Sequence, residues 1–164
     1  MATFSFDIVS EYDKAEMNNV FLQAEKEIAN RYDFKGTPAA IEWLGDKKGF
    51  KIIGSNEWQI DAVSDIVRKK LATREISSKV LDLKESIHES NLKASKDIPF
   101  VEGLSQDKAK QLTKTIRDQF PKAKPQIQGE AVRVTSGSKD ELQAIMAMIR
   151  AADLDFVTSF INFR

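Results

Sequence analysis

Apolar residues recur at steps of three and four positions in four stretches of the chain, a spacing typical of helices that pack one face on a core. The stretches are residues 13–32, residues 56–73, residues 105–120 and the segment that begins at Ser138. Two of them begin with a capping signal, in which a cap residue is followed three positions later by Gln or Glu. These signals are Asn56 with Gln59 and Ser138 with Glu141.

Shorter runs between these helices alternate apolar and polar residues, as strands do. We expect strands over residues 4–9, 39–44, 50–53, 79–83, 125–128, 131–135 and 156–163. Residues 87–100 are more polar, and their pattern does not decide the structure. Two hairpins are expected, one with a loop bounded by Gly45 and Gly49, and one with the two-residue turn Gly129-Glu130.

The elements follow the order strand, helix, strand, strand, helix, strand, and the order then repeats. Lys51-Ile52-Ile53 matches Arg133-Val134-Thr135 at a distance of 82 positions, and the apolar positions of the helices that follow match at the same distance. Such a match indicates an internal duplication. The order of elements is that of the ferredoxin-like fold. We therefore predict an α+β protein of two tandem ferredoxin-like units, residues 1–84 and residues 85–164.

Each predicted unit has two helices on one face of an antiparallel sheet and leaves the other face open. Side chains alternate along a strand, so Lys51, between Phe50 and Ile52, points to the open face, and Arg133 does the same between two valines. One interpretation is a pair of solvated surface cations. The other is a pair of groups that hold phosphate. The sequence leaves both open.

The last predicted strand has aromatic residues on both sides, since Phe156, Phe160 and Phe163 do not share one face. A strand that is apolar on both sides should be covered on both sides. We favour the interpretation that the two units pack on each other there. The alternative is an aromatic shelf on which a nucleic-acid base stacks, as on RNA-recognition modules.

The amino-acid composition excludes several kinds of site. The chain has 164 residues and no cysteine, which excludes disulfides, thiolate metal sites and cysteine nucleophiles. Lys+Arg and Asp+Glu both number 25, so bulk charge does not favour nucleic acid. The beginning of the sequence lacks the basic and apolar regions of a secretory signal, and no apolar run has the length of a membrane helix. We expect a cytoplasmic protein that does not contact a membrane.

Sites for catalysis or metal binding are not evident. His88 is the only histidine, no nucleophile motif is present, and carboxylates do not gather at ligand spacing. We therefore expect no enzyme activity, no metal and no cofactor. The most ligand-like loop is Arg31-Tyr32-Asp33-Phe34-Lys35-Gly36, where two aromatic residues stand among three charged ones.

Several segments resemble the bacterial YajQ family, in the right order and over the whole length. They are Ser5-Phe6-Asp7-Ile8-Val9-Ser10-Glu11, Arg31-Tyr32-Asp33-Phe34-Lys35-Gly36, Ile127-Gln128-Gly129-Glu130, Val132-Arg133-Val134-Thr135, Asp140-Glu141-Leu142-Gln143-Ala144 and Phe160-Ile161-Asn162-Phe163-Arg164. The resemblance implies two ferredoxin-like units that have exchanged their first strands. Strand 4–9 would then pair in the second unit, and the strand near 87–98 in the first.

The resemblance also implies nucleotide binding without catalysis. The partners it suggests are cyclic di-GMP or GTP, tRNA or another RNA, and a transcription regulator. We predict that a nucleotide contacts cationic and acidic side chains, with aromatic residues stacking on the base or supporting the site. The predicted residues are Arg31, Asp33, Phe34, Lys35, Lys51, Arg133, Phe6, Phe163 and Arg164. The alternatives are an RNA-binding module and a protein-interaction adaptor that uses the open sheet faces.

Overall fold

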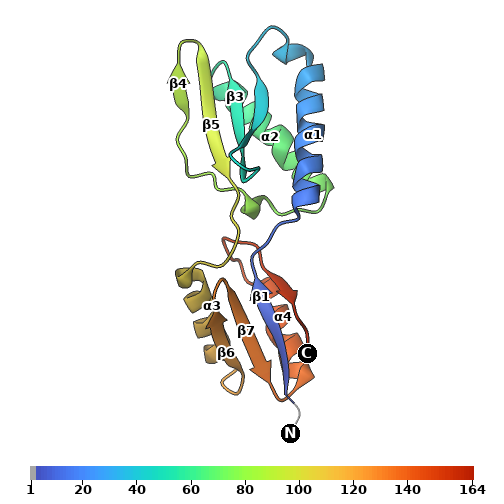
Figure 1. The fold of residues 1–164 in the computed structure, drawn as a ribbon, viewed down its shortest axis with the longest axis vertical. Helices are drawn as coiled ribbons and strands as arrows, with labels where there is room; N and C mark the ends of the chain where they lie inside the picture. Colours follow the sequence, from blue (N-terminus) through green and yellow to red (C-terminus); the bar gives the residue numbers. More distant parts are fainter. Residues whose placement is uncertain (1–2) are drawn as a thin grey trace. The chain divides into compact units, whose positions relative to one another are not determined.

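The computed structural model describes residues 3–164, which divide into two compact units (Figure 1). We name the units by the chain segments that form them. The central unit consists of residues 12–101, and the terminal unit consists of residues 3–11 and 102–164. The division thus places residues 85–101 with the preceding segment, whereas the sequence put a boundary between residues 84 and 85. The reason is that the strand Lys93–Pro99 pairs with the strand Gly49–Gly54 of the preceding segment.

The central unit is a four-stranded antiparallel sheet in the order β2-β3-β5-β4, with helices α1 and α2 packed on β2 and β3. Its elements are α1 (Lys14–Asn30), β2 (Ala40–Leu44), β3 (Gly49–Gly54), α2 (Glu57–Thr73), β4 (His88–Ser90) and β5 (Lys93–Pro99). Phe50 and Ile52 of β3 are fully buried on the helix side, as the alternation predicted. Burial of each such side chain contributes about 1.5–3 kcal/mol.

The terminal unit repeats this architecture with the sheet order β6-β7-β1-β8, again antiparallel throughout. Its elements are β1 (Phe4–Val9), α3 (Gln106–Gln119), β6 (Lys124–Gln128), β7 (Ala131–Ser136), α4 (Lys139–Ala151) and β8 (Ser159–Ile161). The core joins both segments of the chain, because Phe6 and Ile8 of β1 lie in one buried cluster with Val132 and Val134 of β7. The predicted class, two ferredoxin-like α+β units, is confirmed.

The two units have exchanged their first strands. β1 stands first in the chain but pairs with β7 and β8, and in Figure 1 the blue β1 lies between the orange β7 and the red last strand. β5 takes the equivalent place beside β3 and β4 in the central unit. The predicted strand over residues 79–83 is wrong. Ser78–Val80 forms a short 3-10 helix and Leu81 makes a single bridge to Phe100, while the fourth strand of this sheet is β4.

Local signals placed most element ends correctly. Asn56, Ser105 and Ser138 are the N-caps of α2, α3 and α4, and each side chain accepts a hydrogen bond from the backbone N–H three residues later. In the β6–β7 hairpin, Gly129 has a φ of 61°, the positive value that a type II′ turn requires at its first central residue. The remaining differences between expected and observed ends are a few residues, except at the last strand, which is only three residues long.

Candidate functional site

The open face of the terminal unit carries a cation held by a carboxylate. Because Val132 and Val134 are fully buried on the helix side, Arg133 between them points to the open face. Directly across on β1 lies Asp7. Arg133 donates hydrogen bonds from Nε to Asp7 Oδ1 at 2.9 Å and from Nη2 to Asp7 Oδ2 at 3.3 Å. These bonds use two of the five N–H donors of a guanidinium, so donors remain for a ligand.

Asp7 is only 6% exposed, yet it is held in its charged form. The hydrogen bond from Arg133 is the main cause that lowers the pKa of Asp7, and it outweighs burial, which acts in the opposite direction. Asn162 adds a hydrogen bond from Nδ2 to Asp7 Oδ2 at 2.8 Å, which also favours the carboxylate. In return, the bond to Asp7 raises the pKa of Arg133.

A bulge near the end of the sequence places Asn162 and Arg164 beside this pair. Ile161 lies opposite Asp7, but the next backbone pair joins Ser5 and Arg164, so one strand has an extra residue. Asn162 lies in this bulge with a φ of 56°, a value that Asn adopts more readily than most residues. Since Arg164 pairs with Ser5, two residues before Asp7, its side chain belongs to the same open face. Its charge contributes to the lowered pKa of Asp7.

The open face of the central unit has the duplicated cation in a different setting. Lys51 lies on β3 between Glu42 of β2 and Asp97 of β5, each directly opposite in register. In the terminal unit the corresponding neighbours of Arg133 are Gln126 and Asp7. Lys51 therefore faces two carboxylates where Arg133 faces one, and an anion would be attracted less strongly to Lys51.

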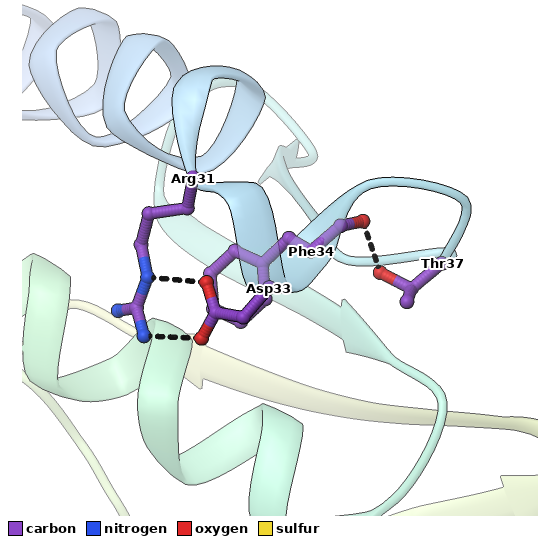
Figure 2. A network of polar contacts seen from close by, with 4 residues as sticks. All are labelled: Arg31, Asp33, Phe34 and Thr37. Carbon is purple, nitrogen blue, oxygen red and sulfur yellow. Dashed lines mark hydrogen bonds and ion pairs between the residues drawn. The ribbon is translucent and has the colours of Figure 1, made fainter.

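The loop after α1 satisfies most of its own polar groups. Figure 2 shows Arg31 and Asp33 joined by two parallel hydrogen bonds of 3.0 and 2.7 Å. The Arg31 guanidinium also lies 4.3 Å from the centre of the Phe34 ring, and Thr37 Oγ1 donates to the Phe34 carbonyl at 2.6 Å. The bond from Arg31 lowers the pKa of Asp33 and raises that of Arg31. These contacts within the loop are sufficient to hold its turn structure without a bound ligand.

Two other side chains of the loop, Tyr32 and Lys35, are exposed. Tyr32 is 87% exposed, and Lys35 Nζ lies 5.9 Å from the centre of its ring. Lys35 was predicted as a site residue and Tyr32 was not, although Tyr32 belongs to the same motif, residues 31–36. Asp7 and Asn162 were not predicted as site residues either. The available signal for these two was their place in the segments quoted for the family resemblance.

The structure separates the predicted site residues into three groups. Arg133, Arg164, Phe6 and Phe163 belong to the terminal unit, whereas the Arg31–Lys35 loop and Lys51 belong to different parts of the central unit. Phe6 is completely buried and Phe34 is 4% exposed. Of the two roles predicted for them, stacking on a base or supporting the site, burial leaves only the supporting role. Phe163 is 61% exposed and retains both.

Neither a membrane span nor a metal cluster is found between residues 3 and 164. No helix there is long and apolar enough to cross a bilayer. The same residues contain no group of three or more His, Asp or Glu side chains arranged to hold a metal ion.

Comparison with known proteins gives matches over the whole chain. A family model described as "Nucleotide-binding protein YajQ-like" matches residues 4–164. A protein of Mycolicibacterium gilvum named "Nucleotide-binding protein" is 45% identical over the full length of both chains. Proteins with the same name from Streptomyces griseus and Thermobifida fusca are 45% and 42% identical, over 100% and 99% of each chain.

Proposed function

This chain belongs to the YajQ family, and we propose that it binds a nucleotide and catalyses no reaction on it. The relatives that support the proposal carry the name "Nucleotide-binding protein" and match over their full length.

The observation that carries the proposal is the charge on the open face of the terminal unit. Arg133 and Arg164 share this face with Asp7, the carboxylate directly across from Arg133. Arginine recognises phosphate through paired N–H donors, and Asp7 fixes the orientation of Arg133 before a ligand arrives. Asn162 adds an amide whose remaining donor can reach a ligand oxygen.

The same geometry supports binding without catalysis. A general base works best when its pKa lies near the operating pH. The pKa of Asp7 is lowered from an already acidic value, because Arg133 and Asn162 stabilise its charged form. Its oxygens are occupied by these donors. Asp7 is therefore suited to position Arg133 rather than to take a proton from a substrate.

Cyclic di-GMP and GTP are the ligands that we propose to test first. Two arginines on one face suit a ligand with more than one phosphate group. RNA binding of the RNA-recognition type is less well supported. Such modules stack bases on aromatic residues of the open sheet face, whereas Phe6 of β1 is completely buried on the helix side and Trp43 of β2 stacks against Phe21 of α1.

The test is a titration with GTP and with cyclic di-GMP, in which Arg133→Gln is compared with its duplicate Lys51→Gln. We expect Arg133→Gln to weaken binding about tenfold, which corresponds to about 1.4 kcal/mol, the lower end for a hydrogen bond to a charged group. Lys51→Gln should leave the affinity unchanged. Charge reversal at both Arg133 and Lys35 tests in addition whether the loop after α1 takes part.

The alternatives give different results. An RNA ligand predicts an affinity that falls steeply with salt, whereas a small nucleotide predicts a shallow dependence. A protein adaptor, for instance one that binds a transcription regulator, predicts no thermal stabilisation by any nucleotide. If no nucleotide stabilises the protein, or if Arg133→Gln binds as the wild type does, the proposed site is wrong.

A further inference from the structure

Strand β2 leaves one edge of the central sheet unpaired. It stands first in the order β2-β3-β5-β4, and within residues 3–164 only β3 pairs with it. The outer edge of such a strand presents backbone N–H and C=O groups to which another strand can bind, and proteins often block it with proline or lysine. β2 contains neither of these residues.

The terminal unit blocks the equivalent edge, which belongs to β6. The register of the duplicated cations makes Pro125 of β6 equivalent to Ile41 of β2. A proline in an edge strand has its nitrogen on the unpaired side, so β6 lacks an outward N–H at Pro125. The Pro125 carbonyl oxygen accepts a hydrogen bond from Arg117 Nη2 of α3 at 3.5 Å. The backbone of Pro125 is therefore closed to a further strand.

β2 keeps both backbone groups at the equivalent position. The N–H and C=O of a strand residue point to the same edge, and the edge alternates from one residue to the next. Ile41, like Pro125, therefore directs its backbone groups outward, and so does Trp43 two residues later. Outside the strand ladders, no backbone hydrogen bond found within residues 3–164 involves Ile41 or Trp43. The outer edge of β2 thus offers two donors and two acceptors to an antiparallel strand.

The flank of α1 beside this edge exposes a leucine. α1 lies over β2, whereas α2 packs on β3 and β5. Glu16 and Glu27 form ion pairs with α2 at 2.8 and 2.9 Å, so they mark the flank of α1 that faces α2. At 3.6 residues per turn, Leu22 lies on the other flank, and it is 51% exposed. The Trp43 ring stacks on the neighbouring Phe21 with centres 4.6 Å apart. An apolar side chain beside Trp43 would therefore cover apolar surface on both the strand and the helix.

The charge on β2 argues against a second copy of this chain at the edge. The antiparallel register that pairs all five residues of two copies of β2 places Glu42 directly opposite Glu42, and like charges in that position are destabilising. Glu42 is exposed on the open face of the sheet. A lysine or arginine opposite it on the outer side would instead be attracted to the carboxylate.

We propose that the outer edge of β2 binds an extended segment of a partner protein as a fifth strand. The segment has apolar residues on the helix side, where they cover Leu22 and Trp43, and a basic residue opposite Glu42. Main-chain hydrogen bonds to Ile41 and Trp43 supply affinity, and the alternating side chains supply specificity. The edge belongs to the central unit, so the inference does not depend on the nucleotide site proposed for the terminal unit.

The probe is the peptide acetyl-Thr-Val-Lys-Val-Thr-amide, with acetyl-Thr-Val-Glu-Val-Thr-amide as its acidic counterpart. Binding to the full chain is followed by NMR spectroscopy and amide hydrogen exchange. We expect the lysine peptide to bind about fivefold more tightly than the glutamate peptide and to slow exchange of the Ile41 and Trp43 amides. Glu42→Gln should make the two affinities equal. N-methylation of both valines removes the donors that face β2 and should abolish binding.

Leu22→Lys tests the contact with α1. Leu22 is exposed enough for this variant to fold, and the lysine peptide should bind it about fivefold more weakly. Leu92→Lys is the matched control, because Leu92 is 92% exposed but lies between β4 and β5, and it should bind the peptide as the wild type does. The proposal is overturned if neither peptide binds, or if the lysine peptide binds without slowing exchange at Ile41 and Trp43. Protection of these amides that rises with protein concentration in the absence of peptide would assign the edge to a second copy instead.

Discussion

Replacement of Asp7 by Asn should move stability and affinity in opposite directions. In the wild type the carboxylate accepts two hydrogen bonds from Arg133 and one from Asn162, while it is 6% exposed. A hydrogen bond to a charged group contributes about 1.5–3 kcal/mol. Asparagine keeps the shape and one acceptor oxygen but loses the charge. We therefore expect the free energy of unfolding of the terminal unit to fall by about 2 kcal/mol.

The same substitution removes a negative charge from beside the proposed phosphate site. In water-like surroundings, the repulsion between Asp7 and a bound phosphate about 4 Å away is about 1 kcal/mol. Its loss should lower the Kd for GTP about fivefold. Stability and function are often opposed at functional sites. The lower stability and higher GTP affinity expected of Asp7→Asn are an example of this opposition.

The assay for stability is urea unfolding followed by far-UV circular dichroism. Tryptophan fluorescence alone would not suffice, because Trp43 and Trp58 both belong to the central unit. Asp33→Asn is the matched control for stability, since Asp33 is also paired with an arginine but at a more exposed position, and it should not change the free energy of unfolding noticeably. The reasoning would be refuted by an Asp7→Asn variant of unchanged stability that binds GTP more weakly.

Three further predictions concern stability. The pKa of Asp7 is lowered in the folded state from about 3.8, so the Asp7 carboxylate contributes its full share to stability above the unfolded pKa and loses it as pH falls toward the lower folded pKa. The difference in unfolding free energy between wild type and Asp7→Asn should therefore shrink below about pH 4. A difference that does not depend on pH would contradict this. Gly49→Ala should destabilise the central unit by about 1–3 kcal/mol in urea unfolding followed by tryptophan fluorescence, because the added Cβ would lie 2.6 Å from the Ile98 carbonyl oxygen. Asn56→Ala should cost about 1 kcal/mol in the same measurement through loss of the bond from the Gln59 N–H, and stability equal to the wild type would show that this cap is not needed.

The exchange of strands is accompanied by a sequence similarity between the two exchanged strands, which the hydrophobic pattern alone does not reveal. Ser5-Phe6-Asp7-Ile8 of β1 resembles Ser95-Lys96-Asp97-Ile98 of β5, and the two strands occupy equivalent places in their sheets. Asp7 faces Arg133 as Asp97 faces Lys51. The alternation in β5 was obscured because Lys96 lies where β1 has Phe6. A polar residue on the helix side makes a strand look like a loop.

The predicted strand over residues 79–83 failed for a related reason. Alternation over a few residues indicates a strand only where a partner offers backbone groups along its length. Leu81 finds such a partner in Phe100 alone, while β4, which lacks any buried residue, pairs with β5 over three residues. Pairing is decided by which strand edges meet, and a polar hairpin can complete a sheet without an apolar signal.

The sequence predicted the cations of the candidate site but not the side chains that surround them. Alternation alone placed Arg133 and Lys51 on open faces, since the direction of a side chain follows from its position in a strand. The neighbours that make one cation better suited to phosphate than the other lie on different strands, namely Asp7 beside Arg133, and Glu42 with Asp97 beside Lys51. Likewise, only the packing shows that Phe6 is buried and Phe163 exposed.

The sequence by itself determined what depends on near neighbours in the chain: the helices, their caps, the hairpins, the duplication and the alternation that sorts each strand into two faces. Tertiary structure decided what depends on residues far apart, which is the exchange of β1 and β5, the bulge at Asn162 and the pairing of Asp7 with Arg133 across 126 positions. The physical reason is that helix and turn signals are read within a few residues. Strand partners and charge environments are set by contacts between segments that no local pattern specifies.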